Sequence, residues 1–466
     1  MNSLCRRYGV LAMCVPLLLW PALLNGYPIV FSDTGTYLSQ AIHRYAGWDR
    51  PVFYSLFMYA LHMTLTTWPV ILAQSVISVW MLDRARAVFF PAVPRAWLGL
   101  VFVVLALCTG LPWLAARLMP DLFTPLLVLA IAILVIAPER LGQWELRLMF
   151  LVALGMVLLH QAHVPLLLGL LALLTPLRRH LGARVRLGAM GLARLAALPV
   201  LALLLLSGVN LAAHGRFAPS PFGGVFLLAR VIDDGPGLRA LQRECPQSGW
   251  RLCAHLDAFP MTSDDFLWRV DSPLNQSGGA KAVADEAGAI ILSALRAEPW
   301  TQGRSLFANT LEQLRRFGPG DGLHPWPHTV SPWIARDFPG FEQRTYAAAR
   351  QDRGDLALPG WLEATDRATA LLGLAAMLLL LWREAPRPTP RVGLIVAVLL
   401  AIVGNAAISG GISGPHDRYQ SRIMWLPAAI GLLALPGHGG RLLRQLGPLC
   451  RPPPHPRWEE RPHAFA

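Results

Sequence analysis

The chain has 466 residues, of which 54% are hydrophobic and 15% are charged, and its formal net charge is +13. Soluble domains carry about a quarter charged residues, so this composition excludes an ordinary soluble protein and predicts an integral membrane protein. The positive charge comes almost wholly from arginine, and no basic stretch is interleaved with base-stacking aromatic residues, which disfavours a nucleic-acid partner.

Ten apolar runs are long enough to cross a bilayer whose hydrocarbon core is about 30 Å thick. No small-x-small cleavage site follows the first run, so we predict an uncleaved first span rather than a secretion signal. The predicted spans are residues 8–25, 68–82, 97–114, 122–137, 148–160, 165–177, 195–213, 368–381, 392–408 and 423–435. The runs 148–160 and 165–177 are short, which leaves the span count open there.

The stretch 27–50 follows the first span directly and carries Asp33 between Ser32 and Thr34. A carboxylate just beyond a span lies at the boundary of lipid and water, where burial and nearby cations can tune it as a base or a ligand. The same residues are typical of a helix N-cap, in which Ser32 or Asp33 begins a short helix. The local sequence alone favours the N-cap.

Residues 50–66 are apolar but are interrupted by Tyr54, Tyr59 and His62. Tyrosine and other polar groups suit the membrane–water interface, so we predict an amphipathic helix that lies in the interface at the outer face. The alternative is a further span, which would invert every later loop and break the arginine distribution of the chain.

Arginine sets the orientation, because the cytoplasmic loops of membrane proteins collect positive charge. With both termini in the cytoplasm, the inward segments contain about twenty arginines. The short outward loops contain only Arg44, Arg50, Arg117, Arg418 and Arg422. The sequence therefore predicts about ten transmembrane helices, with both termini inside and the long segment 214–367 outside.

The segment 214–367 is predicted to be one small, mostly helical domain on the outer face. Cys245 and Cys253 lie in it, and two cysteines eight residues apart in an oxidising compartment predict a disulfide. No cysteine and histidine spacing is typical of zinc. The predicted division is a transmembrane module at 1–213, the outer domain at 214–367, a second transmembrane module at 368–437, and a disordered cytoplasmic tail at 438–466.

Four polar motifs face the outside in this topology. They contain Asp33, Asp121 in RLMPD, His160 and His163 in HQAHVP, and His416, Arg418, Tyr419 and Arg422 after a glycine-rich turn. Each motif has a structural alternative: an N-cap for the second aspartate, carbonyl contacts for the paired histidines, and lipid headgroup contacts for the arginines. Ionisable residues at membrane depth are costly, however, and the arginine fork suits phosphate oxygens. Their presence on one face therefore favours a site where a carboxylate stands opposite phosphate-binding arginines.

Several of these features resemble the GT-C superfamily of polytopic membrane glycosyltransferases, such as the protein O-mannosyltransferases and the aminoarabinose transferases. The resemblance covers mainly residues 1–177 and 368–435, whereas 214–367 matches no family that we recognise. The features that carry it are the first outer loop with Asp33, the interfacial helix introduced by Arg50-Pro51, the Pro120-Asp121 loop and the late Arg418-Tyr419.

The resemblance implies inverting transfer of a sugar from a polyprenyl-phosphate donor to a lipid or glycan acceptor. Asp33 would be the base, and Arg418, with His416 and Arg422, would hold the leaving phosphate. Many members carry an Asp-Glu pair in the first loop, whereas Thr34 follows the aspartate here. No cofactor is therefore predicted, and a divalent metal is disfavoured. The expected location is the bacterial inner membrane, with multiple spans and the active site on the periplasmic face.

Two other hypotheses stay open on the sequence. A lipid-linked glycan polymerase or ligase would place its chemistry on His214, Arg216 and Arg230 in the outer segment. A transporter would keep ionisable groups near the midplane of broken helices, but the predicted spans are nearly free of charge, which disfavours transport. The sequence identifies neither the sugar nor the acceptor.

Overall fold

The computed structural model describes residues 3–446, and every regular element in that range is a helix, which confirms the all-helical class. The first half contains α1 (Ser3–Cys14), η1 (Pro16–Leu18), α2 (Trp20–Asn25), α3 (Thr34–His43), α4 (Val52–His62), α5 (Trp68–Phe89), α6 (Trp97–Cys108), α7 (Leu111–Ala115), η2 (Pro120–Leu122), α8 (Phe123–Ile136), η3 (Pro138–Arg140), α9 (Gln143–Leu159), α10 (His163–Leu177) and α11 (Ala189–His214). The second half contains α12 (Gly223–Asp233), α13 (Pro236–Glu244), η4 (Arg251–Ala258), α14 (Ser263–Trp268), α15 (Pro273–Gln276), α16 (Gly279–Ala297), α17 (Pro299–Arg315), α18 (Ser331–Asp337), α19 (Gly340–Ala347), α20 (Leu362–Glu384), α21 (Pro390–Ala406), η5 (Ala407–Gly411) and α22 (Asp417–Leu446).

Within residues 3–446, three helical stretches are long and apolar enough to cross a membrane: α11, α20 and the continuous pair α21–η5. Only 28% of the apolar window of α11 is buried in the protein, and leucines such as Leu204 are half exposed. A helix that is apolar all round and largely uncovered requires a lipid environment. The fold is therefore that of a helical protein with membrane character.

The other predicted spans fall on helices that are shorter or more polar, so the count of ten stays a prediction. The first span is divided into α1, η1 and α2, with Pro16 and Pro21 in the first turns of the last two. Proline lacks a backbone N–H and clashes with the preceding turn, so it ends the helix before it. The predicted interfacial helix corresponds to α4, which packs against α3, α5 and α9.

Helix α8 occupies the centre of the bundle, and all of its residues are buried. It packs against α5, α9, α10 and α21. Its sequence, FTPLLVLAIAILVI, is apolar on every side, which is the pattern of a helix surrounded by others. Helices α20 and α22 approach closely at Gly373, where a Cβ atom would lie 2.3 Å from the backbone nitrogen of Ala428. Small residues allow this kind of close packing between membrane helices.

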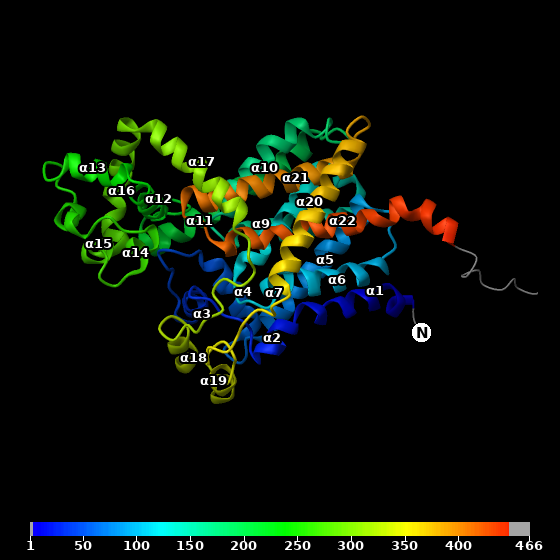
Figure 1. Ribbon diagram of the computed structural model, residues 1–466, viewed down its shortest axis with the longest axis horizontal. Coiled ribbons are helices and arrows are strands. Elements are labelled where there is room, and N and C mark those ends of the chain that lie inside the picture. Colours follow the sequence, from blue (N-terminus) through cyan, green and yellow to red (C-terminus); the bar gives the residue numbers. More distant parts are fainter. Residues whose placement is uncertain (1–2, 447–466) are drawn as a thin grey trace, which may run out of the picture.

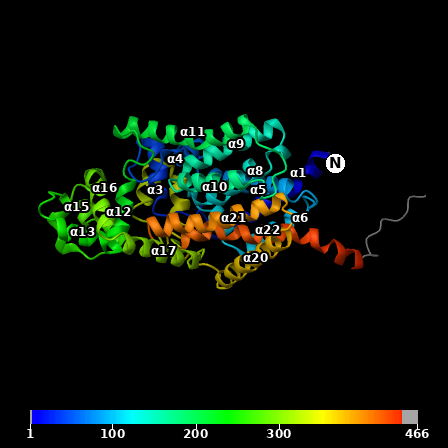
Figure 2. The same ribbon diagram turned by 90° about the horizontal axis from the view of Figure 1, so that it is seen from above.

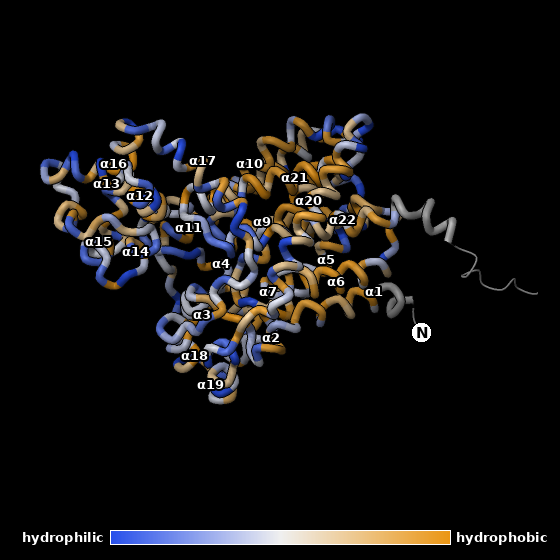
Figure 3. The backbone as a smooth tube through the Cα atoms, viewed as in Figure 1, coloured by the Kyte–Doolittle hydropathy of each residue, from blue (hydrophilic) through white to orange (hydrophobic). Residues whose placement is uncertain are grey.

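A helical lobe of α12–α16 projects from one end of the bundle, while the N-terminus and the end of α22 lie at the opposite end (Figures 1 and 2). The lobe is richer in hydrophilic residues than the bundle (Figure 3). The buried core of the lobe is separate from that of the bundle and includes Val225, Phe266 and Ile290, with Trp48 of the first outer loop packed against it.

The segment 214–367 packs in two different ways. Its first part forms the lobe, whereas α17 returns along the bundle to pack on η5 and α21. Later residues such as Phe317, Leu323 and Ile334 belong to the core of the bundle, and α18 packs on α3. The second part of the segment therefore covers the first outer loop, which places it beside the candidate site.

Cys245 and Cys253 form a disulfide within the lobe, with Cα atoms 5.5 Å apart. Residues 438–446 differ from the predicted disordered tail, because they continue helix α22. Leucine and arginine in this stretch are good helix formers, which accounts for the extension. The rest of the predicted tail, 447–466, lies outside the described residues.

Candidate functional site

The candidate site forms where the first outer loop meets the loop before η2. Ile29 and Arg117 make an isolated parallel bridge, in which the backbone N–H of Ile29 donates to the Ala116 carbonyl and that of Leu118 donates to the Ile29 carbonyl. The Thr34 hydroxyl adds a hydrogen bond to the Leu118 carbonyl. These contacts fix the two loops side by side.

Asp33 precedes the first residue of α3, but its side chain makes no capping hydrogen bond. Its carboxylate lies 2.9 Å from Arg50 and 3.6 Å from Arg418, and only 11% of the side chain is exposed. The N-cap interpretation therefore accounts for the backbone position of Asp33 and not for its side chain. The carboxylate is used in ion pairs that join the first outer loop to the start of α22.

Arg418 is held over the ring of Phe31, with the guanidinium carbon 3.9 Å from the ring centroid. Its backbone N–H donates to Asp321. Its Nη1 atom is buried without a hydrogen-bond partner, since the 3.6 Å contact with Asp33 is longer than a hydrogen bond. Arg418 is thus positioned by stacking and charge while part of its donor capacity stays unused.

Arg117 approaches the same ring, with its guanidinium carbon 5.8 Å from the centroid, and donates to the Asp321 carbonyl at 2.7 Å. Gly322 makes room for the ring, because a Cβ atom there would lie 2.1 Å from Phe31. We call Phe31, Asp33, Arg50, Arg117 and Arg418 the Asp33 cluster. It contains three arginines and one carboxylate, which is a net cationic setting.

The electrostatics of the cluster keep Asp33 ionised. Burial alone raises the pKa of its carboxyl, but the charges of Arg50 and Arg418 outweigh burial, and the net effect is a pKa below the ordinary value. The neighbouring Asp49 differs, because burial dominates there and raises its pKa. Asp33 is therefore a weakly basic, ion-paired carboxylate.

A second polar group lies deeper and consists of Asp121, Arg422, Asn405 and Ser409, which we call the Asp121 network. Arg422 is fully buried, lies 3.0 Å from Asp121, and also donates to Asn405 and Ser409. The other carboxylate oxygen of Asp121 is buried without a hydrogen-bond partner. Burial raises the pKa of Asp121, but Arg418, Arg422 and Arg117 lower it further than burial raises it. The two groups are therefore electrostatically linked, with Arg418 between them.

The two predicted histidines of HQAHVP have different surroundings. His163 is buried, and its Nδ1–H donates to the Met156 carbonyl, which leaves Nε2 to accept from the Thr124 hydroxyl. Both ring nitrogens are used, so His163 is a structural residue. His160 accepts a hydrogen bond from the Ala162 N–H.

The remaining residues of the last outer loop separate from one another. His416 turns toward the lobe, where it lies 3.2 Å from Asp264. The ring of Tyr419 lies between Arg418 and Arg422, at 5.0 and 5.6 Å from their guanidinium carbons. Tyr419 is therefore packed inside the site, whereas His416 connects this loop to the lobe.

The structure does not collect the residues of the polymerase hypothesis into one cluster. His214 makes an edge-to-face contact with Phe222, Arg216 pairs with Asp285 on an exposed surface, and Arg230 pairs with two aspartates at the C-terminal end of its own helix. These contacts belong to the packing of the lobe, and no observation favours that function over the Asp33 cluster.

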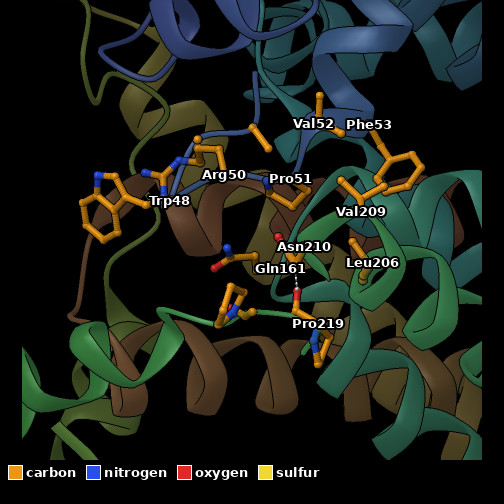
Figure 4. A pocket seen from close by; sticks show the side chains of 14 residues that line it. Trp48, Arg50, Pro51, Val52, Phe53, Gln161, Leu206, Val209, Asn210 and Pro219 are labelled. Atoms are coloured by element: carbon orange, nitrogen blue, oxygen red, sulfur yellow. Dashed lines mark hydrogen bonds between the residues drawn. The ribbon is translucent and has the colours of Figure 1, made fainter. Parts of the chain in front are cut away.

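A narrow cavity adjoins the cluster on the side of α11 (Figure 4). Trp48 and Arg50 lie at one end of it, and Leu206 and Val209 lie with other apolar side chains at the other end. Asn210 donates to the Pro219 carbonyl at its edge. Since Arg50 contacts Asp33, the cavity lies next to the charged cluster, with apolar side chains of α11 on its far side.

The residues of the site do not fit a divalent cation. No group of three or more histidine, cysteine, aspartate or glutamate side chains that could hold a metal occurs within residues 3–446. The closest charged partners of Asp33 are two guanidinium groups, which occupy the positions that a cation would take.

Sequence reasoning named Asp33, Arg418, Arg422 and Asp121 but missed the site roles of Arg50, Arg117, Phe31 and Asp321. One signal was available. Arginine is rare in the short outer loops, and four of the five outer arginines meet at this site, the exception being the exposed Arg44.

No protein-family model, curated protein or solved structure matches the chain, so these comparisons assign it to no family.

Proposed function

We propose that the protein is a membrane glycosyltransferase of the GT-C type. It moves a sugar from a polyprenyl-phosphate donor to an acceptor hydroxyl at the outer face of a bacterial inner membrane. One observation carries the proposal: Asp33 and Arg418 lie 3.6 Å apart in an arginine-rich cluster that adjoins a narrow cavity lined by both polar and apolar residues. Displacement of a phosphate leaving group needs a base for the acceptor hydroxyl and cationic donors for the phosphate, and the cluster contains both kinds of group.

The proposed topology has ten spans, with both termini in the cytoplasm. It is supported by the excess of arginine in the inward segments and by the position of both chain ends of the bundle opposite the lobe (Figure 1). The Asp33 cluster is then on the periplasmic side, where the first and last outer loops meet.

In the proposed reaction the acceptor oxygen attacks the anomeric carbon from the face opposite the phosphate. A bond forms between the acceptor oxygen and this carbon, the bond to the phosphate oxygen breaks, and the configuration inverts. Asp33 accepts the proton of the acceptor hydroxyl. Arg418, with Arg117 beside the same aromatic ring, stabilises the negative charge that grows on the leaving polyprenyl phosphate.

Donor binding also tunes the base in this proposal. The arginine charges hold the pKa of Asp33 below its ordinary value while the site is empty. A phosphate at Arg418 neutralises part of that charge, so the pKa of Asp33 rises and the carboxylate becomes a stronger base. Deprotonation of the acceptor is thereby favoured only when the donor is in place.

In this proposal the polyprenyl chain lies against α11, next to the cluster. The cavity beside Arg50 is lined on its far side by Leu206 and Val209 of α11, and α11 exposes leucine to the surroundings of the bundle. A lipid chain on this side would leave its phosphate next to the arginines. This geometry supports entry of the donor laterally from the membrane.

Sugar transfer tests the proposal directly. Membranes from producing cells supply the acceptor, and a panel of radiolabelled polyprenyl-phosphate sugars supplies the donor. Folded Asp33→Asn protein should lose about 10²- to 10⁴-fold in rate, which is the usual contribution of a general base. Asp33→Glu keeps the charge and should retain part of the rate, while Arg44→Lys, outside the site, should match the wild type. Transfer by Asp33→Asn at the wild-type rate, or a wild type inactive with every donor, would contradict the proposal.

A further inference from the structure

A second cavity lies at the end of the bundle away from the lobe, where the connections α5–α6, α8–α9, α10–α11 and α20–α21 meet. Its volume is about 220 Å³. Arg140, Arg184 and Arg391 line it, and each comes from a different connection or helix start. No residue of this cavity takes part in the Asp33 cluster or the Asp121 network.

The charges around this cavity are unbalanced. Among the described residues that line it, none is acidic. Arg140 donates one hydrogen bond to the Val88 carbonyl. Arg391 pairs at 2.8 Å with Glu384, which is not among the residues that line the cavity. A guanidinium carries five N–H donors, so these contacts leave most of the donors open. Burial, and then the charge of Arg184, lower the pKa of Arg140 by more than the nearby Glu139 raises it.

Apart from Thr389, the rest of the lining is apolar and includes Phe89, Phe90 and Leu433. Arginines at the cytoplasmic ends of spans commonly contact lipid headgroups one at a time. Here three of them surround one cavity with an apolar floor. Basic pockets between membrane helices on the cytoplasmic side are the usual sites for anionic lipid headgroups, and arginine forks match phosphate oxygens.

We propose that this cavity is a binding site for a phosphate group, supplied in the membrane by an anionic phospholipid of the inner leaflet. The phosphate would sit between Arg140 and Arg184, and the glycerol and upper acyl carbons would contact the phenylalanines. The same guanidinium chemistry would accept a free phosphate ion, so the test must separate the two sources. The proposal does not rest on sugar transfer and stands or falls independently of it.

Thermal unfolding of the full chain in a neutral detergent tests the site, because a ligand that binds the folded state raises the melting temperature. The probes are dioctanoyl phosphatidylglycerol and inorganic phosphate, each titrated separately. We expect phosphatidylglycerol to raise the melting temperature of the wild type. We expect Arg140→Gln/Arg184→Gln to weaken its apparent affinity at least about tenfold, as the loss of one charge-assisted hydrogen bond implies.

The control is Arg147→Gln/Arg179→Gln, which removes the same charge from exposed positions outside the cavity and should respond like the wild type. Arg184→Gln alone covers the case in which the double variant fails to fold. Stabilisation by phosphatidylglycerol that exceeds that by phosphate supports a lipid ligand. Equal stabilisation by inorganic phosphate would overturn the lipid assignment, and unchanged affinity in the cavity variants would overturn the site.

Discussion

Arg418→Lys is the substitution that best separates charge from geometry in the Asp33 cluster. The wild-type guanidinium is 6% exposed, is stacked over Phe31 and has a buried Nη1 donor without a hydrogen-bond partner. Lysine keeps the positive charge near Asp33. It cannot present two parallel donors to a phosphate, and it loses the planar stacking of the guanidinium.

The expected magnitude follows from these contacts. The 3.6 Å ion pair with Asp33 includes no hydrogen bond, so lysine should preserve most of its contribution to folding. Phosphate binding loses one charge-assisted hydrogen bond, which contributes about 1.5–3 kcal/mol. Since about 1.4 kcal/mol corresponds to a factor of ten, affinity for a polyprenyl phosphate should fall about 10- to 150-fold.

The assay measures the affinity for undecaprenyl phosphate by isothermal titration calorimetry, with the protein in nanodiscs. Arg44→Lys is the matched control, because Arg44 is an outer-loop arginine that is exposed and lies outside the cluster. Both variants should elute as folded protein with similar melting temperatures. Equal affinities in Arg418→Lys and the control would refute the assignment of Arg418 as a phosphate ligand.

Three further predictions concern stability and topology. Gly373→Ala should destabilise the bundle by about 1–3 kcal/mol through overpacking of α20 on α22, whereas Gly208→Ala, which meets no atom within 4 Å, should be neutral or slightly stabilising in thermal unfolding. The two arginines lower the pKa of Asp33, so its ion pairs stabilise the fold above the ordinary carboxyl pKa and are lost as pH falls through the lowered value. Asp33→Asn should therefore lower the melting temperature strongly at pH 7 and only weakly in acid, and a deficit independent of pH would contradict this. A reporter fused after Arg186 should report a cytoplasmic location, and a periplasmic signal would exclude the ten-span topology.

The sequence predicted those features of the structure that depend on one continuous segment of the chain. The apolar run 122–137 predicted a span, and one continuous helix, α8, lies there, although its complete burial was not predicted. The two lobe cysteines predicted the disulfide that is present. The topology argument placed Asp33 and Arg418 on one face, and they lie within ion-pairing distance. Helix breaks were harder to place, because Pro16 and Pro21 interrupt an apolar run without lowering its hydropathy.

Partners that lie far apart in the chain could not be assigned from the sequence. Asp121 and Arg422 pair although 301 positions separate them in the chain. Asp33 and Arg50 lie on either side of helix α3, and the path of the chain after this helix brings them together. The role of a histidine also depends on residues that are distant in sequence or not marked by a local pattern. Both ring nitrogens of His163 are hydrogen-bonded, one to the Met156 carbonyl and one to the Thr124 hydroxyl, and the sequence does not show these partners. Such pairings depend on tertiary packing, which propensity and periodicity do not encode.

The most direct test of the shared donor site is a cryo-electron microscopy structure of the full chain in nanodiscs with undecaprenyl phosphate. The proposed function predicts phosphate density within about 2.7–2.9 Å of the Arg418 guanidinium, next to Asp33, with the lipid chain leading into the cavity beside Arg50 and α11. Lipid phosphate bound at another place, with the Asp33–Arg418 pair undisturbed, would contradict it.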